Sequence, residues 1–415
     1  MIESIGGFKM PNIDRLYSDR AGKMRKSVIR ELLKVAQDPD IISFAGGLPN
    51  PKSFPTDDLT DIIQKVMKKH ATTALQYGTT QGYTELRKQL AERSLKDGMK
   101  DIDEDNIIIT NGSQQALDTV GKLFLNPGDT AIVGSPTYLG GINAYKSYES
   151  FLEGIPLDKD GMVIDELEEK IKQLQKDDII PKFIYVVPTF QNPAGVVMSE
   201  KRRKKIIDIA NDYDLVIVED DPYGKLAYDI DHIKPIKAYD DEGRVIYMST
   251  FSKILAPGLR LAWTVASDEL TRKMVICKQA LDLCTNTFTQ FIANEFLRQG
   301  SLDLHIMKIC QMYRPKRDIM VKSIQSYFPE GYTCNKPKGG MFTWVTFPEG
   351  IDTETMFLDA IKHKVAYVHG KAFHVDGGGA RSLRLNFSYS SDEKIEEGIK
   401  RLGKVVEDRL AMVST

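Results

Sequence analysis

Cysteine is scarce in this sequence, and the few cysteines are not arranged as metal ligands usually are. The four thiols stand at positions 277, 284, 310 and 334, and none of them forms a Cys-x-x-Cys pair. The six histidines are scattered, and no His-Glu-x-x-His pattern occurs. These absences argue against a zinc module or a metalloprotease, so we expect reduced thiols and no metal site.

The sequence also lacks long apolar runs and any large excess of charge. No apolar run approaches the roughly 18 residues of a membrane span, and the polar N-terminus has no signal-peptide core. The formal net charge of -2 gives no overall attraction to nucleic acid or to anionic membranes. We therefore expect a cytoplasmic protein with no nucleic-acid partner and no membrane partner.

What is present is an ordinary globular composition on a chain of 415 residues. Hydrophobic residues make up 42% and charged residues 27% of the sequence, as is usual for soluble proteins with a substantial core. A chain of this length predicts two or three domains, or one large domain with a smaller one attached.

The middle of the chain alternates short apolar runs with segments of helical spacing. The apolar runs are rich in β-branched residues and have the length of buried strands; they cover 106–110, 130–136, 182–190, 215–219 and 245–248. Buried apolar strands that alternate with helices indicate an α/β fold with a mostly parallel central sheet and helices on both faces.

The C-terminal part of the chain has a different pattern. A helical stretch over roughly 267–328 carries no strand pattern. Short strands are then predicted within 332–348, 365–370 and 382–388, followed by a closing helix over 391–410. This order predicts a separate, smaller α+β domain that is reached through a long connecting helix.

Polar side chains follow four of the predicted strands at the points where the strands end. They are found in residues 111–114, 191–195, 220–223 and 249–253. In an open parallel sheet, ligands bind outside the carboxyl ends of the strands. We therefore expect an anion cradle, an amide, a carboxylate with a phenol, and a lysine to meet at one edge of the sheet.

Each of these groups has a simpler explanation when it is taken alone. Ser113 is a suitable helix cap, although a Gly-Ser turn at a helix start also suits phosphate. Asn192 lies in a sequence that favours an ordinary turn. Asp220 fits a solvated acidic turn or a metal ligand of a nucleotide site, but the chain has no phosphate-binding loop of the Walker type. Lys253 alone fits a surface lysine.

Together, these groups suit pyridoxal phosphate. The aldehyde of this cofactor needs a lysine amine, and its pyridine nitrogen needs a carboxylate that keeps it protonated. The ring oxygen needs hydrogen-bond donors, and the phosphate needs N–H groups, hydroxyls and a cation.

An ordered set of segments carries a specific resemblance. The segments are LQYGTTQGYTELR, TNGSQQALD, PTYLG, QNPAG, VEDDPYG and TFSKILAPGLRLAW. Across nearly the whole chain the sequence resembles the fold-type-I aminotransferases of class I and II, in the kynurenine/2-aminoadipate, multi-substrate branch. The resemblance implies an N-terminal segment over 1–60 that packs with the small domain and the active site. It also implies a large cofactor-binding domain over 61–315 and a small domain over 316–415.

The resemblance implies a role for each matching residue of the cofactor site. Lys253 resembles the lysine that binds the cofactor aldehyde, Asp220 the partner of the pyridine nitrogen, and Tyr138 the aromatic residue that stacks on the ring. Asn192 and Tyr223 resemble the donors to the ring oxygen, and Asn192 also belongs to the implied substrate site. The residues that resemble phosphate ligands are Ser113, Gln114, Ser252 and Arg260, with Thr250 at a position where relatives often have serine.

Other residues are implied in substrate binding and in assembly. Tyr77 resembles the tyrosine that reaches the phosphate from a neighbouring subunit, which implies a homodimer. Arg384 resembles the arginine that binds the substrate α-carboxylate, a task that suits a planar guanidinium. Arg30, with Ser27 one turn earlier, and Gly47 match residues that meet the distal part of the substrate. The alternative for Arg30 is a surface helix cap.

The implied activity is the transfer of an amino group from an L-amino acid to a 2-oxo acid by a ping-pong mechanism. The donor would be of 2-aminoadipate, aromatic or branched-chain type, and 2-oxoglutarate is the expected acceptor. Lys253 and Asp220 would equally serve a β-lyase or a decarboxylase on the same fold. A regulator with an aminotransferase-like domain would carry a basic DNA-binding segment of roughly 60 residues or more, which we do not expect here. An inactive scaffold is disfavoured by the intact polar set.

Overall fold

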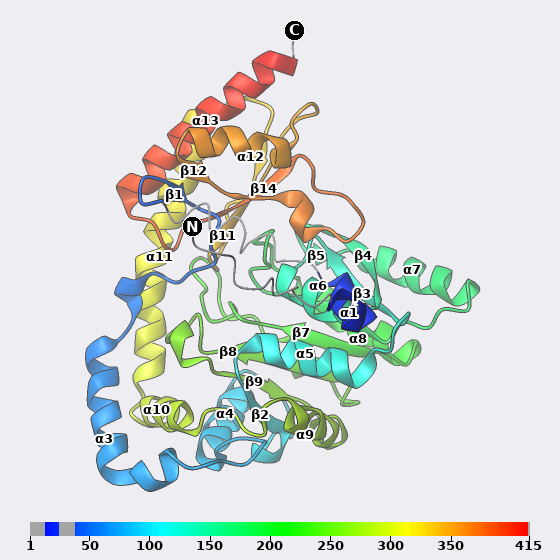
Figure 1. Cartoon of the computed structure of the whole chain (residues 1–415), viewed down its shortest axis with the longest axis vertical. Coiled ribbons are helices and arrows are strands. Elements are labelled where there is room, and N and C mark those ends of the chain that lie inside the picture. The colour runs from blue at the N-terminus through cyan, green and yellow to red at the C-terminus, as the bar shows by residue number, and fades with distance from the viewer. Residues whose placement is uncertain (1–12, 25–37, 414–415) are drawn as a thin grey trace, which may run out of the picture.

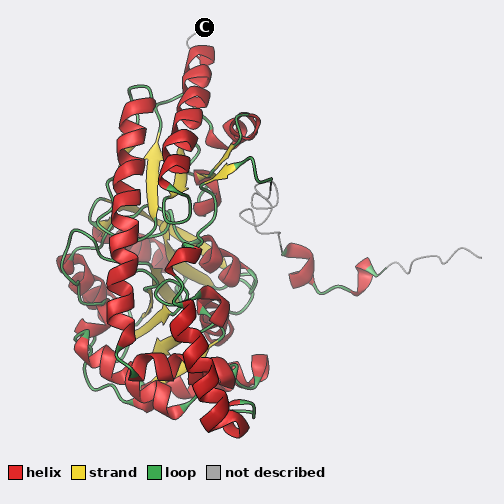
Figure 2. Cartoon of the chain, turned by 90° about the vertical axis from the view of Figure 1, so that its left-hand side faces the viewer, coloured by secondary structure: helices red, strands yellow, loops and turns green. Residues whose placement is uncertain are grey.

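The computed structural model describes residues 13–24 and 38–413. The implied substrate contacts Ser27 and Arg30 lie outside these residues. In the described part, strands occupy the middle of the molecule and helices surround them (Figures 1 and 2). Each helix in this part is too short or too polar to cross a membrane.

A central sheet of eight strands forms the larger body, and the predicted α/β fold with a mostly parallel sheet is confirmed. The strand order is β2-β9-β8-β7-β6-β3-β4-β5. The strands are β2 (Ile107–Thr110), β3 (Thr130–Ser135), β4 (Phe151–Asp158), β5 (Gly161–Met162), β6 (Phe183–Val186), β7 (Val216–Asp220), β8 (Val245–Thr250) and β9 (Ala262–Val265). Pairing is parallel from β8 through β4, whereas β9 is antiparallel to both of its neighbours and β5 is antiparallel to β4.

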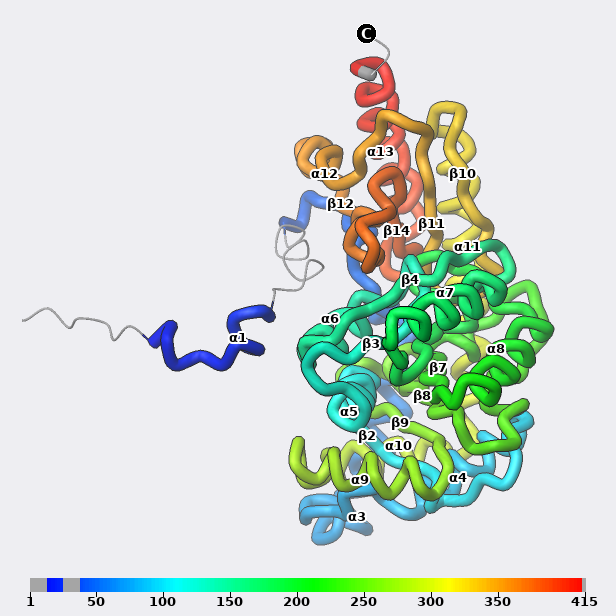
Figure 3. The backbone as a smooth tube through the Cα atoms, turned by 90° about the vertical axis from the view of Figure 1, so that its right-hand side faces the viewer, coloured from blue at the N-terminus to red at the C-terminus, as the bar shows by residue number. Residues whose placement is uncertain are grey.

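Apart from β4, the strands of this sheet are buried on both faces, which explains their continuous apolar runs. The covering helices are α5 (Ser113–Phe124), α6 (Leu139–Lys146) and α9 (Asp268–Asp282) on one face, and α7 (Ile164–Lys176) and α8 (Glu200–Asp212) on the other. On β6, Phe183 and Tyr185 pack on the face covered by α5, α6 and α9, whereas Ile184 and Val186 pack on the face covered by α7 and α8. The alternation follows from the two-residue period of a strand, and Figure 3 shows α5 and α6 on one side of β3 and β7 with α8 on the other.

The helical stretch expected over 267–328 is divided into three helices. They are α9, α10 (Thr287–Arg298) and α11 (Ser301–Tyr327). The backbone leaves helical geometry at Leu283, with φ of 62°, and at Gly300, with φ of 70°, so the helix ends at each of these residues. Helix α11 then runs from the large sheet to the smaller body (Figure 1). Two further helices, α3 (Thr56–Ala74) and α4 (Thr84–Lys96), pack against α10.

The smaller body is an antiparallel sheet with helices against it, as expected for an α+β domain. Its strand order is β10-β11-β14-β13. The elements are β10 (Thr333–Cys334), β11 (Phe342–Thr346), β13 (Val368–His369), β14 (Ser382–Asn386), α12 (Thr353–Lys362) and α13 (Asp392–Val413). On β14, Leu383 and Leu385 join the core. Because side chains alternate along a strand, Arg384 is directed to the opposite face.

The segment after residue 37 lies against the smaller body, although it is far from it in sequence. Strand β1 (Ile42–Ser43) pairs in parallel with β12 (Val365–Ala366). The Asn50 side-chain amide donates hydrogen bonds to the carbonyls of Ser388 and Tyr389. Nearer the N-terminus, α1 (Asp19–Lys23) contacts the large body through Lys23, which pairs with Glu149, and through Arg20, which lies over the Tyr148 ring. The short 3-10 helices are η1 (Asp14–Leu16), η2 (Pro51–Ser53), η3 (Glu104–Asn106), η4 (Ile236–Tyr239), η5 (Pro257–Leu259) and η6 (Gly370–Phe373).

Candidate active site

A cavity of about 530 Å³ opens beyond the carboxyl ends of β6, β7 and β8. It is closed on other sides by the start of α5, by β11 and β14, and by the segment before η2. The predicted site residues that line it are Gly47, Ser113, Gln114, Tyr138, Asn192, Asp220, Tyr223, Thr250, Ser252, Lys253, Arg260 and Arg384. Tyr77 does not line it, and this side chain is 77% exposed on the surface.

Lys253 follows β8, and its amine faces the cavity. The Nζ atom donates a hydrogen bond of 2.9 Å to the carbonyl of Gly47. Burial, with the nearby charges of Arg384 and Arg260, lowers the pKa of Lys253 to about 8. About a tenth of the amine is therefore uncharged at pH 7, far more than for an ordinary lysine, and the uncharged form is the one that acts as a nucleophile. The alternative of a solvated surface lysine is wrong.

Asp220 is the last residue of β7 and is only 1% exposed. Its Oδ2 accepts a hydrogen bond of 2.8 Å from the Tyr185 hydroxyl. Its Oδ1 is buried and has no hydrogen-bond partner in the described part of the chain. Burial raises the pKa of Asp220 to about 7, against the opposing effect of the Tyr185 hydrogen bond. The alternative of a solvated acidic turn is wrong, and one carboxyl oxygen remains available to a buried donor.

Arg384 is a buried cation whose described neighbours include no carboxylate partner. Its Nη1 donates 2.8 Å to Asn192 Oδ1 and its Nη2 donates 2.6 Å to the Ala45 carbonyl, while Nε has no partner among the residues described. The guanidinium lies 4.2 Å from the ring centroid of Phe342 and 5.0 Å from that of Phe373. Burial lowers the pKa of Arg384 to about 10. A buried cation of this kind is costly unless an anion joins it, so the arrangement favours an anionic ligand.

Asn192 connects this cation to a phenol on the neighbouring strand end. Its Nδ2 donates a hydrogen bond of 3.4 Å to the Tyr223 hydroxyl, while its Oδ1 is used by Arg384. Burial raises the pKa of Tyr223 well above that of an ordinary phenol, so the phenol stays protonated and can itself donate.

The start of α5 forms the other end of the cavity. Gly112 has φ of 74°, and a Cβ atom there would overlap the Arg260 guanidinium. Ser113 is the first helical residue, and its hydroxyl is buried with no partner among the described groups, so the interpretation as a helix cap is wrong. Thr250 Oγ1 lies 3.0 Å from Ser252 Oγ. Helix N–H groups, hydroxyls and a guanidinium together suit a phosphate.

Tyr138 precedes α6, and its ring lies directly on Gly140, where a Cβ atom would overlap it. Gln114 Nε2 donates 3.1 Å to the Gly140 carbonyl. The two side chains are thus held together beside the start of α5, with the aromatic ring on the cavity wall.

The residues present fit pyridoxal phosphate. The cavity offers an amine of lowered pKa, an unpaired carboxyl oxygen, an unpaired hydroxyl at a helix start, and a glycine that lets a guanidinium approach that helix. These are the groups that the aldehyde, the pyridine nitrogen and the phosphate of the cofactor require. Tyr185, Phe342 and Phe373 belong to the site and were not predicted.

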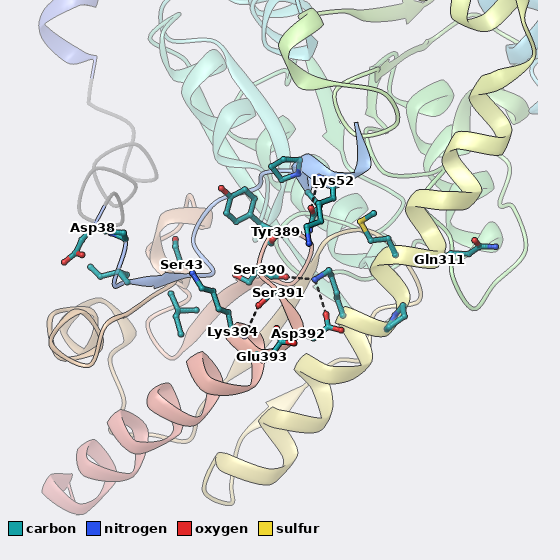
Figure 4. A pocket seen from close by; sticks show the side chains of 18 residues that line it. Asp38, Ser43, Lys52, Gln311, Tyr389, Ser390, Ser391, Asp392, Glu393 and Lys394 are labelled. Carbon is teal, nitrogen blue, oxygen red and sulfur yellow. Dashed lines mark hydrogen bonds and ion pairs between the residues drawn. The ribbon is translucent and has the colours of Figure 1, made fainter. Parts of the chain in front are cut away.

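A larger cavity, of about 860 Å³, lies between the segment around residues 38–52, α11 and the start of α13 (Figure 4). Lys316 reaches into this region, but its Nζ donates 2.6 Å to the Ser390 carbonyl and 3.1 Å to Asp392 Oδ1. Lys316 is therefore already paired with a carboxylate, whereas the Lys253 amine has a carbonyl partner and no carboxylate partner among the described residues. Size alone does not make the larger cavity the catalytic one.

Comparison with known proteins gives the same class. The chain matches the family described as Aminotransferase class I and II over residues 48–402. Aromatic-amino-acid aminotransferase 1 of Thermococcus litoralis is 50% identical over 402 residues, 96% of each chain. The structure of Pyrococcus horikoshii kynurenine aminotransferase, in complex with PMP, KYN and KYA, has a TM-score of 0.93 at 50% identity and covers 96% of this chain and 98% of that chain.

A third similar protein is LysN, the α-aminoadipate aminotransferase of Thermus thermophilus, complexed with N-(5'-phosphopyridoxyl)-L-leucine. Its structure has a TM-score of 0.88 at 35% identity and covers 96% of this chain and 99% of that chain. The fold and the site thus define a pyridoxal-phosphate-dependent transferase. More specifically, this chain belongs to the class I and II aminotransferases, and it is an enzyme that transfers amino groups with this cofactor.

Proposed function

We propose that the cavity around Lys253 transfers the amino group of an L-amino acid of aromatic, 2-aminoadipate or branched-chain type to 2-oxoglutarate, by a ping-pong mechanism. The observation that carries this proposal is the buried Arg384 guanidinium, which faces the same cavity as the Lys253 amine and has no acidic partner among its described contacts. An amino acid and a 2-oxo acid both bring the carboxylate that such a cation lacks.

The residues that would hold the cofactor are those of the cavity wall. Lys253 would hold its aldehyde carbon, Asp220 its ring nitrogen, and Asn192 and Tyr223 its ring oxygen. Its phosphate would be held by Ser113, Gln114, Thr250, Ser252 and Arg260. When bound, pyridoxal phosphate supplies a carbonyl that condenses with primary amines and a ring that accepts the electron pair left at the α-carbon.

The chain's own residues would bind the substrate and move the proton. Arg384 holds the α-carboxylate, and Asn192 fixes the guanidinium through the bond between them. The Lys253 amine, with its pKa lowered to about 8, takes the α-proton and returns it. Asp220, whose carboxyl accepts a hydrogen bond from the Tyr185 hydroxyl, would keep the ring nitrogen of the cofactor protonated.

The donor class is supported by the wall of the cavity and by the similar proteins. Gly47, Leu48, Tyr138 and Phe342 present apolar and aromatic surface, which suits an aromatic or aliphatic side chain. The similar proteins named above act on aromatic amino acids, kynurenine and α-aminoadipate according to their names.

The proposal includes a homodimer that works in the cytoplasm. Tyr77 is exposed and outside the cavity of its own chain, so its implied phosphate contact requires a second chain. Leu75 and Leu283 are also exposed. Gly78, close to Leu75 and Tyr77 in sequence, lies beside Thr287, close to Leu283 in sequence, so the segments that carry these exposed side chains are neighbours. Exposed apolar groups of this kind are typical of subunit interfaces.

The test is a visible absorption spectrum of the purified protein with pyridoxal phosphate, repeated after adding single amino acids without any oxo acid. Conversion of the cofactor band, with one equivalent of 2-oxo acid released, is the expected result, and the converting amino acids rank the donors. Lys253→Ala should bind cofactor without turnover. Release of ammonia or carbon dioxide would instead indicate a β-lyase or a decarboxylase, and an unchanged band with every amino acid would overturn the proposal.

A further inference from the structure

Three polar side chains meet where the large body contacts the small one, beside the active site but outside its cavity. We call them the Ser135 cluster: Ser135, His374 and Asp376. Ser135 ends β3 of the large sheet, and the other two follow η6 of the smaller body. Ser135 Oγ donates 2.8 Å to Asp376 Oδ2 and lies 3.0 Å from His374 Nδ1, and His374 Nδ1 lies 3.3 Å from Asp376 Oδ1.

The composition of the cluster is that of a hydrolase triad, but its geometry is not. In such a triad the serine and the carboxylate use opposite nitrogens of the histidine ring, so that the histidine takes the serine proton while the carboxylate orients the ring. Here Ser135 and Asp376 both lie at Nδ1, and the serine hydroxyl donates directly to the carboxylate. The serine is not activated by a base, so the cluster acts as a link between two segments.

The two linked segments each carry a part of the active site. The Thr137 amide donates 2.8 Å to the Phe373 carbonyl, which adds a backbone bond beside the cluster. Tyr138, on the cavity wall, is the next residue on one side of this bond. On the other side, the Phe373 ring lies 5.0 Å from the Arg384 guanidinium.

Packing around the cluster is close. A Cβ atom on Gly154 of β4 would come within 2.9 Å of the Ser135 Cβ and 3.1 Å of Asp376 Oδ2. Ser135 is 6% exposed. The serine end of the link therefore has little freedom to reorganise when a partner is removed, whereas the Asp376 side chain is 50% exposed.

We propose that Ser135, His374 and Asp376 are positioning residues for the substrate carboxylate. They hold Phe373 against Arg384 and fix this cation relative to the Tyr138 turn, without touching substrate or cofactor. The inference rests on the proposed function in one respect, the role of Arg384.

The first experiment is Ser135→Ala in the cofactor-loaded enzyme. Loss of the link should raise KM for the amino acid about tenfold while kcat changes by no more than about twofold, because binding is weakened equally in the ground and transition states. The matched control is Ser94→Ala, which removes a buried hydroxyl that bonds the Leu90 carbonyl far from the site and should leave KM unchanged. A KM of the Ser135 variant equal to that of the control would overturn the inference.

A second pair of variants separates the link from mere stability. His374→Asn keeps a polar group towards Ser135, so its KM should stay close to that of the wild type. His374→Leu removes this group and should raise KM as Ser135→Ala does. In the cofactor-free protein, hydrogen exchange of the Thr137 amide should quicken in the Leu variant and not in the Asn variant. Equal KM and equal exchange in both variants contradict a positioning role.

Arg384→Lys distinguishes this inference from the proposed function. If Arg384→Lys leaves KM for the amino acid unchanged, the carboxylate role of Arg384 is wrong, and the proposed function fails in that part. If Arg384→Lys raises KM and Ser135→Ala does not, only the positioning role fails.

Discussion

At the scale of the residue, the most informative group is the Asp220 carboxyl. It is buried with a single described hydrogen-bond donor, the Tyr185 hydroxyl, and its pKa is raised to about 7. In the protein without cofactor, this carboxyl therefore gains a proton far more readily than it does in the unfolded chain. A cationic group that reached Oδ1 would stabilise the charged form of this carboxyl.

This raised pKa makes the stability of the cofactor-free protein depend on pH. The folded-state pKa lies above the unfolded value, so the contribution of Asp220 is fully present below about pH 4 and is lost as the pH rises through about 7, up to roughly 4 kcal/mol in all. Urea unfolding between these pH values should show a smaller decline for Asp220→Asn than for the wild type. Glu219, whose burial also raises its pKa to about 7, is present in both proteins and cancels. Parallel stability curves would contradict the raised pKa of Asp220.

Single residues could be predicted where they stand at strand ends, and not where they lie within strands. Lys253, Asp220 and Asn192 are polar groups that interrupt apolar runs, and the structure brings them to one cavity. Tyr185 lies inside an apolar run and has the pattern of a core residue. Its contact with Asp220 depends on the pairing of β6 with β7, which a single sequence does not specify. The roles of these residues stay predictions.

At the scale of the element, the start of α5 depends on one glycine. Gly112 combines φ of 74° with a position at which a Cβ atom would overlap Arg260 Nη2. Only a residue without a Cβ atom satisfies both conditions. The helix N-terminus and the guanidinium can then face the same ligand.

Gly112→Ala should weaken pyridoxal phosphate binding by about tenfold or more, because the new methyl group displaces a charged phosphate ligand. Gly128→Ala is the matched control, since Gly128 has φ of 89° and open space around its Cα. Both variants should lose about 1 kcal/mol of stability through backbone strain. Titration of the cofactor-free proteins with pyridoxal phosphate checks the first claim, and equal affinities for the two variants would refute it.

Elements with a simple period were predictable, and those set by tertiary contacts were not. The runs that became β2, β3, β6, β7 and β8 are apolar on both faces. Strand β4 was not predicted because its residues are mostly exposed or half-buried, so it has no apolar run. Strand β9 was not predicted because it follows the site loop and enters the sheet antiparallel to its neighbours. The break at Leu283 carries no glycine or proline to mark it.

At the scale of the whole molecule, Tyr77 and Lys253 differ in where they lie, although both are expected to contact the cofactor. Lys253 lines the cavity of its own chain, while Tyr77 is exposed on the surface of the same chain. If both serve one cofactor, each site is built from two chains related by symmetry. The domain boundaries near residues 60 and 315 likewise stay predictions, although β1 pairs with a strand of the smaller body.

Mixing two defective variants tests this arrangement. Tyr77→Phe should weaken cofactor binding, and Lys253→Ala should abolish turnover. Subunit exchange between them gives hybrid dimers with one intact site, so about a quarter of the wild-type sites should be recovered at limiting cofactor. A light-scattering mass should confirm the dimer before mixing. No recovery, with exchange shown by mass, would mean that Tyr77 does not act across an interface.

The pairing of β1 with β12 has a consequence for synthesis on the ribosome. The Gly47 carbonyl that accepts from Lys253 lies five residues after Ile42, whose strand partner is Val365. A chain is made from its N-terminus, so this early segment has no strand partner until residues beyond 365 have emerged. Arg384 emerges later still. The large sheet can form first, but the cavity is completed only near the end of translation, so a truncated product that lacks its last tens of residues would hold a folded sheet and no finished site.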